Sequence, residues 1–121
     1  MNLRDSISAA KKSGPDLQPD GASAFEFSFS ADDPTFAGHF PTRPILPGIF
    51  QIEIVRLAAE WILSRQFSIQ EITKAKFQRP VLPGEILKLN LKLSETSGQI
   101  SARGQFVCSG QPAGEALLKL A

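Results

Sequence analysis

Apolar and polar residues alternate strictly at residues 24–30, where Phe25, Phe27 and Phe29 share one face. A period of two is typical of a half-buried strand. Further extended stretches lie toward the C-terminus, at residues 69–78, 86–95, 99–109 and, more briefly, 116–120. The links between them are short and contain Pro83-Gly84, Ser97-Gly98 and residues 110–114, so the pattern predicts antiparallel neighbours.

Residues 48 to about 66 show a different pattern, with no Gly or Pro after the first position and apolar residues on nearly every face. This pattern predicts a helix that is buried on most sides. Its few polar residues lie three or four positions apart and therefore form one stripe, which we expect to meet water, a partner or a site. They are Glu53, Arg56, Glu60 and Ser64.

The segments before this helix carry less regular signal. Residues 31–48 are rich in proline, which fixes backbone angles, and they predict a long, stiff loop. Residues 1–23 are rich in Ser, Lys, Asp, Gly and Pro, with only a short possible helix at 3–11. We expect them to form a poorly packed or partly disordered arm in front of one domain, residues 24–121.

The order of one strand, a stiff loop, one apolar helix and a run of strands predicts an α+β domain. In it an antiparallel sheet wraps around one long central helix. A helix that is apolar all round is more than one small sheet can cover, so we expect a dimer. The length of 121 residues and the 42% hydrophobic content agree with a single domain that has a real core.

The charge and the single cysteine exclude several classes of protein. A formal net charge of +1 gives no global basic field that would hold nucleic acid or an anionic membrane. Cys108 alone cannot form an internal disulfide, which fits a reducing cytoplasm, and we interpret it as a core thiol. No secretory leader pattern is present, and charged residues interrupt the apolar stretch at 45–63. We therefore expect a cytoplasmic protein that does not span a membrane.

Two residues are candidates for acid-base chemistry. His39 lies in the stiff loop, and although a lone loop histidine is more often structural, a general base has to be held in place. Glu53 has two interpretations that the residues leave open. It pairs with Arg56 one turn away, worth roughly 0.2–0.5 kcal/mol if exposed, or burial in the apolar helix favours its protonated form as a proton donor, which Arg56 opposes.

Pro47-Gly48 opens the predicted helix, so the N–H groups of Gly48 and Ile49 have no intrahelical acceptors and could bind a developing oxyanion. The commoner interpretation is an ordinary helix start in which Gly permits the turn. The sequence has no phosphate-binding loop, no Gly-x-Ser-x-Gly motif and no cluster of metal-ligand residues. It therefore gives poor support to nucleophilic or metal catalysis, and no cofactor is expected.

Two hexapeptides are nearly identical: residues 43–48 read Arg-Pro-Ile-Leu-Pro-Gly and residues 79–84 read Arg-Pro-Val-Leu-Pro-Gly. The longer segment 38–49, Gly-His-Phe-Pro-Thr-Arg-Pro-Ile-Leu-Pro-Gly-Ile, is followed by a carboxylate fourteen positions after the His. This segment resembles the active-site segment of the 3-hydroxyacyl-acyl-carrier-protein dehydratases of the hot-dog fold. Residues 76–85, Lys-Phe-Gln-Arg-Pro-Val-Leu-Pro-Gly-Glu, resemble the second signature of that family.

The resemblance implies a hot-dog fold and a lyase that removes water from a 3-hydroxyacyl thioester in fatty acid, lipid or polyketide synthesis. It implies that His39 and Glu53 are the catalytic pair, and that Gly48 or Ile49 meets the thioester oxygen. It also implies a homodimer, or a higher oligomer, in which His from one subunit faces the carboxylate of the other. The chain departs from the family at Leu57, where a Gln is common.

Two alternatives remain: a hot-dog acyl thioesterase, and a non-catalytic module that binds an acyl carrier or an acyl chain. The resemblance implies that the substrate is carried by an acyl carrier protein or by coenzyme A. Carrier proteins are usually acidic, so docking would use a local basic patch. Its candidates flank the two motif segments: Arg43, Arg65, Lys74, Lys76 and Arg79.

Overall fold

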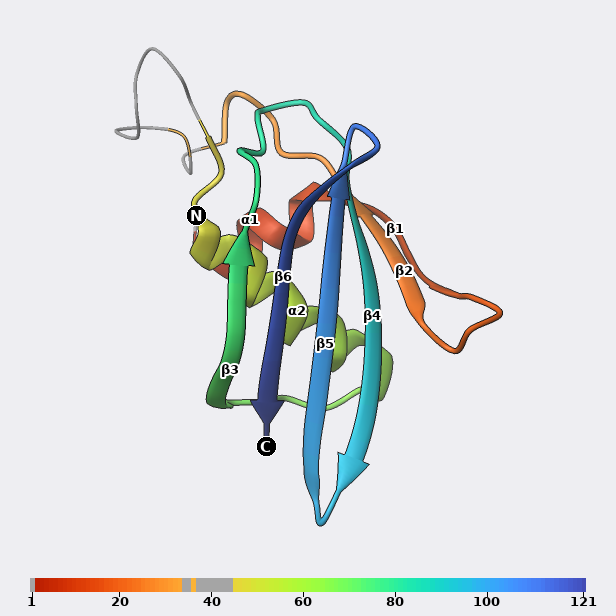
Figure 1. The fold of residues 1–121 in the computed structure, drawn as a ribbon. Helices are drawn as coiled ribbons and strands as arrows, with labels where there is room; N and C mark the ends of the chain where they lie inside the picture. The colour runs from red at the N-terminus through yellow and green to blue at the C-terminus, as the bar shows by residue number, and fades with distance from the viewer. Residues whose placement is uncertain (1, 34–35, 37–44) are drawn as a thin grey trace.

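The computed structural model describes residues 2–33, 36 and 45–121. In chain order its elements are α1 (Leu3–Ala10), β1 (Lys11–Leu17), β2 (Ser23–Phe27), α2 (Gly48–Leu63), β3 (Ile69–Phe77), β4 (Leu87–Thr96), β5 (Gln99–Cys108) and β6 (Gln111–Leu120). The six strands form one antiparallel sheet in the order β1-β2-β4-β5-β6-β3. Figure 1 shows α2 crossing behind this sheet, with α1 behind the upper part of the sheet.

The core lies between α2 and the concave face of the sheet. Ile54, Val55 and Leu57 of the helix have no exposed surface, and β4 turns alternate leucines such as Leu87 and Leu89 against them. This packing follows from the apolar surface of the helix, because only burial on most sides removes such a surface from water. The predicted α+β arrangement, a sheet wrapped around one long helix, is confirmed.

The N-terminal residues are better packed than the sequence predicts. The expected short helix is present as α1, capped by the Asn2 side chain, which accepts a hydrogen bond from the N–H of Asp5 at 2.8 Å. Ile7 of α1 is completely buried, and β1 pairs with β2 at the edge of the sheet. Residues 12–17, for which the sequence predicts no element, thus belong to an edge strand of the sheet. Most β1 side chains are exposed, so backbone pairing rather than an apolar pattern builds this strand.

Several element boundaries differ from the predicted ones, and two of these differences have a clear physical reason. The helix α2 ends at Leu63 because Ser64 adopts a left-handed conformation with φ of 53°. Strand β6 begins at Gln111, five positions before the predicted start, and so includes Pro112 and Gly114, two residue types that normally signal a turn. Cys108 is fully buried, as predicted, and burial raises the pKa of its thiol.

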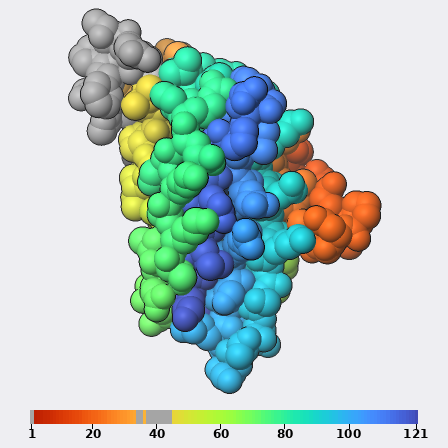
Figure 2. Space-filling view, in the orientation of Figure 1, coloured from red at the N-terminus to blue at the C-terminus, as the bar shows by residue number. Residues whose placement is uncertain are grey.

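The strand β3 forms one edge of the sheet and is the least covered strand. All its residues after Ile69 are exposed, including Ile72 and Phe77, each with 47% of its surface accessible. Figure 2 shows this strand in green beside β6, β5 and β4 on the outer face of the sheet. Its only strand neighbour in the described part of the chain is β6. No helix among these residues is long and apolar enough to cross a membrane.

Candidate active site

The first turn of α2 lies directly against the end of β3. A Cβ atom added to Gly48 would be 2.6 Å from the ring of Phe77, so the ring occupies the space that any other residue at this helix start would need. A cavity of about 310 Å³ opens here, bordered by residues 45–48 and 77–80 and by Gln51. The cavity therefore joins the two motif segments that the sequence singles out.

The two near-identical hexapeptides are also joined by a backbone hydrogen bond. The N–H of Leu46 donates to the carbonyl of Val81 at 2.8 Å, and the N–H of Gly84 donates to the carbonyl of Phe29 at the same distance. Leu46 and Val81 are both buried. The second hexapeptide thus fixes the chain at two places, just after β2 and just before α2.

The turn that contains the second hexapeptide is itself held by side chains. Arg79 donates to the carbonyl of Cys108 at 2.8 Å and forms an ion pair with Glu85 at 3.0 Å. The Glu85 carboxylate also accepts from the N–H of Leu82 and from the hydroxyl of Ser109. These contacts, with the Leu82 N–H first, lower the pKa of Glu85. The motif 79–85 is therefore a rigid support for the start of α2.

The start of α2 carries the two backbone N–H groups that the sequence singles out. Pro47 is the N-cap and its ring offers no oxygen to the helix, so the N–H groups of Gly48 and Ile49 lack a side-chain partner from the cap. Ile49 is 53% exposed, whereas Gly48 borders the cavity. Of the two predicted residues, Gly48 is therefore the one that the structure places at the cavity. The predicted base, His39, lies outside the described residues, as does Arg43.

Glu53 lies in α2, with 19% of its side chain exposed. Arg56 binds both oxygens of its carboxylate: Nε donates to Oε2 and Nη2 donates to Oε1, each at 2.7 Å. The pairing interpretation of Glu53 is therefore realised, but as a two-bond clamp in a sheltered position rather than as a loose surface pair. Glu53 holds the pKa of the Arg56 guanidinium above its usual value.

The clamp continues along the polar stripe of α2. Nη1 of Arg56 donates to Glu60 at 2.9 Å and to the carbonyl of Phe67 at 3.1 Å. Glu60, only 7% exposed, accepts from the N–H of Phe67 at 2.8 Å and from Arg4 of α1 at 3.1 Å. Three members of the predicted stripe, Glu53, Arg56 and Glu60, are thus joined in a chain of alternating charge that ends at Arg4 of α1. The fourth, Ser64, is the exposed C-cap of the helix and lies outside this chain.

Gln51 is a site feature that the sequence does not reveal. It is 2% exposed, and its Oε1 atom is buried without a hydrogen-bond partner among the described residues. The space for its side chain exists because residue 114 of β6 is glycine: a Cβ there would collide with Oε1. A glutamine inside an apolar helix was the available signal, but its meaning depends on a glycine that lies 63 positions later.

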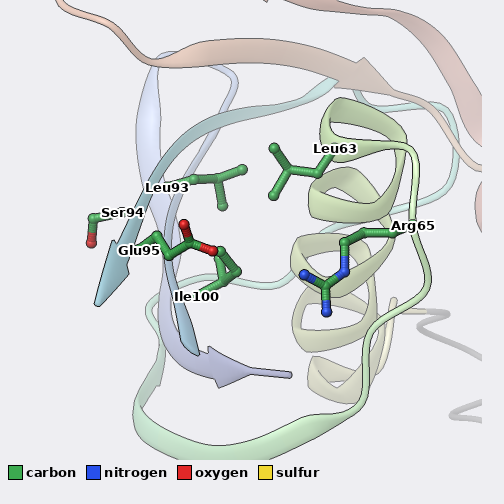
Figure 3. A pocket seen from close by; sticks show the side chains of 6 residues that line it. All are labelled: Leu63, Arg65, Leu93, Ser94, Glu95 and Ile100. Carbon is green, nitrogen blue, oxygen red and sulfur yellow. The ribbon is translucent and has the colours of Figure 1, made fainter. Parts of the chain in front are cut away.

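A second hollow lies at the opposite end of α2. It has a volume of about 320 Å³, and Figure 3 shows Arg65 and Glu95 on its walls with Leu63, Leu93 and Ile100 between them. Arg65 follows the C-terminal end of the helix, whereas Lys76 lies next to Phe77, which contacts the N-terminal end. The predicted basic candidates therefore do not gather in one patch.

The arrangement of one sheet around one helix is the hot-dog fold. The chain resembles one from the dehydratase heterocomplex ApeI:P of Xenorhabdus doucetiae, with a TM-score of 0.74 and 27% identity over 92% of this chain and 96% of that one. A probable thioesterase from Bartonella henselae has a TM-score of 0.64 and covers 83% of this chain and 88% of its own length. At 14% identity, the latter likeness concerns the fold alone.

Sequence comparison identifies the family within this fold. Residues 16–111 match the ApeI-like family model, described as ApeI dehydratase, and the chain belongs to this family. It is 34% identical over 103 residues to the 3-hydroxyacyl-[acyl-carrier-protein] dehydratase FabZ of Haemophilus influenzae strain 86-028NP, which covers 78% of this chain and 70% of that protein. FabZ of Actinobacillus succinogenes is also 34% identical over 103 residues, covering 78% and 69%.

Proposed function

We propose that the protein eliminates water from a 3-hydroxyacyl thioester and releases the trans-2-enoyl thioester, in fatty acid synthesis or a related lipid or polyketide pathway. The observation that carries this proposal is the combination of a family segment with a cavity at the start of α2. The FabZ relatives, named as 3-hydroxyacyl-acyl-carrier-protein dehydratases, support the substrate class. Glu53, the carboxylate that the family segment implies as the partner of His39, lies on the same helix.

In the proposed reaction, His39 removes a proton from C2 of the substrate, which the thioester carbonyl acidifies. Glu53 gives a proton to the 3-hydroxyl, the C3–O bond breaks, and water leaves as the C2–C3 double bond forms. Exchange of a proton from His39 to Glu53 then resets the pair. The N–H of Gly48 or Ile49 stabilises the negative charge on the thioester oxygen, a contact whose loss typically costs about 10²–10³-fold in rate.

The first experiment follows ultraviolet absorbance, because the conjugated enoyl thioester absorbs where the 3-hydroxyacyl thioester does not. Wild-type protein is expected to interconvert the two, and H39A and E53Q are expected to lose at least about 10²-fold in kcat. E95Q is the matched control, because Glu95 lines the hollow at the other end of α2. Retained elimination in both site variants would overturn the assignment. Release of free thiol without elimination would instead support a thioesterase.

We propose further that the active enzyme is a homodimer, in which His39 of one subunit works with Glu53 of the other. The exposed outer edge of β3, with Ile72 and Phe77 on it, supports an interface there. Mixing H39A with E53Q tests this arrangement. Random exchange of subunits should restore about a quarter of wild-type activity, because half of the dimers then hold one intact site. A pair built within one subunit would show no recovery.

The proposed carrier of the substrate is an acyl carrier protein, with coenzyme A as the alternative. Lys74 and Lys76 are exposed on β3, whose last residue, Phe77, lies against the start of α2. Arg79 also borders the cavity there, but it is engaged by Glu85 and by the carbonyl of Cys108. Reversing both charges should raise KM for a carrier-linked substrate and leave KM for a short thioester mimic unchanged. Reversal of Lys92, an exposed lysine of β4, is the control. An equal effect on both substrates would refute docking at β3.

A further inference from the structure

We propose that Arg56 is a positioning residue that fixes the Glu53 carboxylate for proton transfer, through a chain of contacts anchored at Phe67 and Arg4. The inference rests on the proposed role of Glu53. A proton donor has to hold one geometry, and a misplacement of about 1 Å can cost about 10²-fold in rate. Leu57 cannot provide that support, because its side chain is apolar and fully buried.

The geometry of the guanidinium is what distinguishes Arg56 from an ordinary helix ion pair. All three nitrogen atoms are used: Nε and Nη2 bind the two oxygens of Glu53, and Nη1 binds Glu60 and the carbonyl of Phe67. A planar group held on three sides cannot rotate independently of its partners. Each Glu53 oxygen receives one hydrogen bond from Arg56, so each keeps a second lone-pair position, which is where the proton to be transferred would be carried.

The far end of the chain is fixed to parts of the fold outside α2. Glu60 accepts from the backbone N–H of Phe67, a buried residue that precedes β3 in the chain, and from Arg4 of α1. The position of Glu53 is therefore fixed, through Arg56 and Glu60, by the backbone at residue 67 and by the N-terminal helix, and not only by its own helical turn. The N-terminal helix thereby contributes to the site without lining its cavity.

The charges in this chain balance one another. Two carboxylates, Glu53 and Glu60, alternate with two guanidinium groups, Arg56 and Arg4. The inner members are sheltered, with 17% of the Arg56 side chain and 7% of the Glu60 side chain exposed. Because a sheltered charge is costly without a partner, removal of one member leaves its neighbours uncompensated. A conservative Arg56→Lys variant would keep the charge but not the two-bond geometry.

The first test measures the contact itself by ¹⁵N NMR of the Arg56 Nε–Hε group. This group is expected to be ordered and slow to exchange in wild-type protein, and faster to exchange in E60Q and E53Q. Arg103, an exposed arginine paired with Glu115, is the internal reference. Exchange at Arg56 as fast as at Arg103 in the wild type would overturn the inference, whatever the enzyme's activity.

The second test measures the effect on catalysis. R56M and R56K are expected to lose about 10²-fold in kcat with little change in KM. In R56A, added ethylguanidinium is expected to restore activity several-fold at concentrations that leave the fold intact, an effect that a purely structural arginine would not show. R103A should be unaffected and should gain nothing from the additive.

The outcomes separate the inference from the proposed function. An active wild type with an unchanged kcat in R56M would overturn the positioning role alone. A loss of activity in R56A that matches a loss of folded protein, without recovery by ethylguanidinium, would assign Arg56 to stability instead. A wild type without elimination activity would overturn the proposed function and the catalytic role of Arg56 together, while the NMR result still decides whether Arg56 holds Glu53.

Discussion

Pro47-Gly48 and Pro83-Gly84 close two nearly identical stretches of sequence, yet the glycines serve different physical needs. Gly84 has φ of +82°, and a Cβ there would meet no atom within 4 Å, so the need is purely conformational. Gly48 begins a regular helix, and a Cβ there would strike the Phe77 ring at 2.6 Å, so the need is purely spatial. The segment that ends at Gly84 supports the site, whereas the segment that ends at Gly48 forms part of the wall of the cavity.

This difference predicts that equivalent substitutions will fail in different ways. The conformational glycine should affect the stability of the fold, because its turn ties the chain after β2 to the chain before α2. The spatial glycine should affect the chemistry, because a Cβ there would collide with the Phe77 ring and push the helix start away from its place beside the cavity. The largest expected effect is therefore on catalysis at Gly48.

Gly48→Ala should lower kcat by about 10²-fold, the size of losing one donor to the thioester oxygen. The physical reason is that Phe77 and the first turn of α2 must separate, which moves the N–H groups of Gly48 and Ile49. Steady-state kinetics with a 3-hydroxyacyl thioester would measure this loss. The double variant with Phe77→Ala should recover part of it because the space is restored. Full activity in Gly48→Ala would contradict the proposed role of the helix start.

Gly84→Ala should instead reduce the free energy of unfolding by about 1–2 kcal/mol, the cost of a left-handed conformation for a residue with a Cβ. Urea denaturation would measure the change, and kcat at low temperature should remain near that of the wild type. Gly84→Asn is the matched control, because Asn tolerates this conformation better. If Gly84→Ala lost kcat without losing stability, the distinction between the two turns would collapse.

The sequence predicts some parts of the fold better than others. Strands with apolar alternation and the apolar helix are found, because burial leaves a periodic pattern. Strand β1 is missed because its side chains are largely exposed, and the start of β6 is missed because Gly114 serves a packing need. At the site, the stripe on α2 is predictable, but the contact between Arg4 and Glu60 joins residues 56 positions apart.

Gln51 lies one turn after Gly48 and places a buried polar side chain at the start of α2. It therefore bears on the comparison between Gly48, which borders the site, and Gly84, which supports it. Gln51→Met keeps an unbranched side chain and removes the buried Oε1 atom that has no described partner. The free energy of unfolding should rise by about 1 kcal/mol, the lower end of the cost of an unsatisfied buried group. Chemical denaturation would measure it, with the exposed Gln105→Met as the control. A destabilised Gln51→Met variant would indicate that the amide is satisfied in solution.

The smallest expected effect concerns the acid stability of the second turn. Contacts led by the Leu82 N–H lower the pKa of Glu85 in the folded protein below its ordinary value. A depressed carboxyl pKa contributes stability above the unfolded value, near 4.5, and this contribution is lost as pH falls through the folded value. Glu85→Gln should therefore be less stable than wild type at pH 7 and should approach it below pH 4.5. Thermal denaturation from pH 7 to pH 3, with Glu95→Gln as the exposed control, would measure the convergence. A gap that stayed constant across this range would show that the neutral hydrogen bonds of Glu85, rather than its charge, hold the turn that supports Gly48.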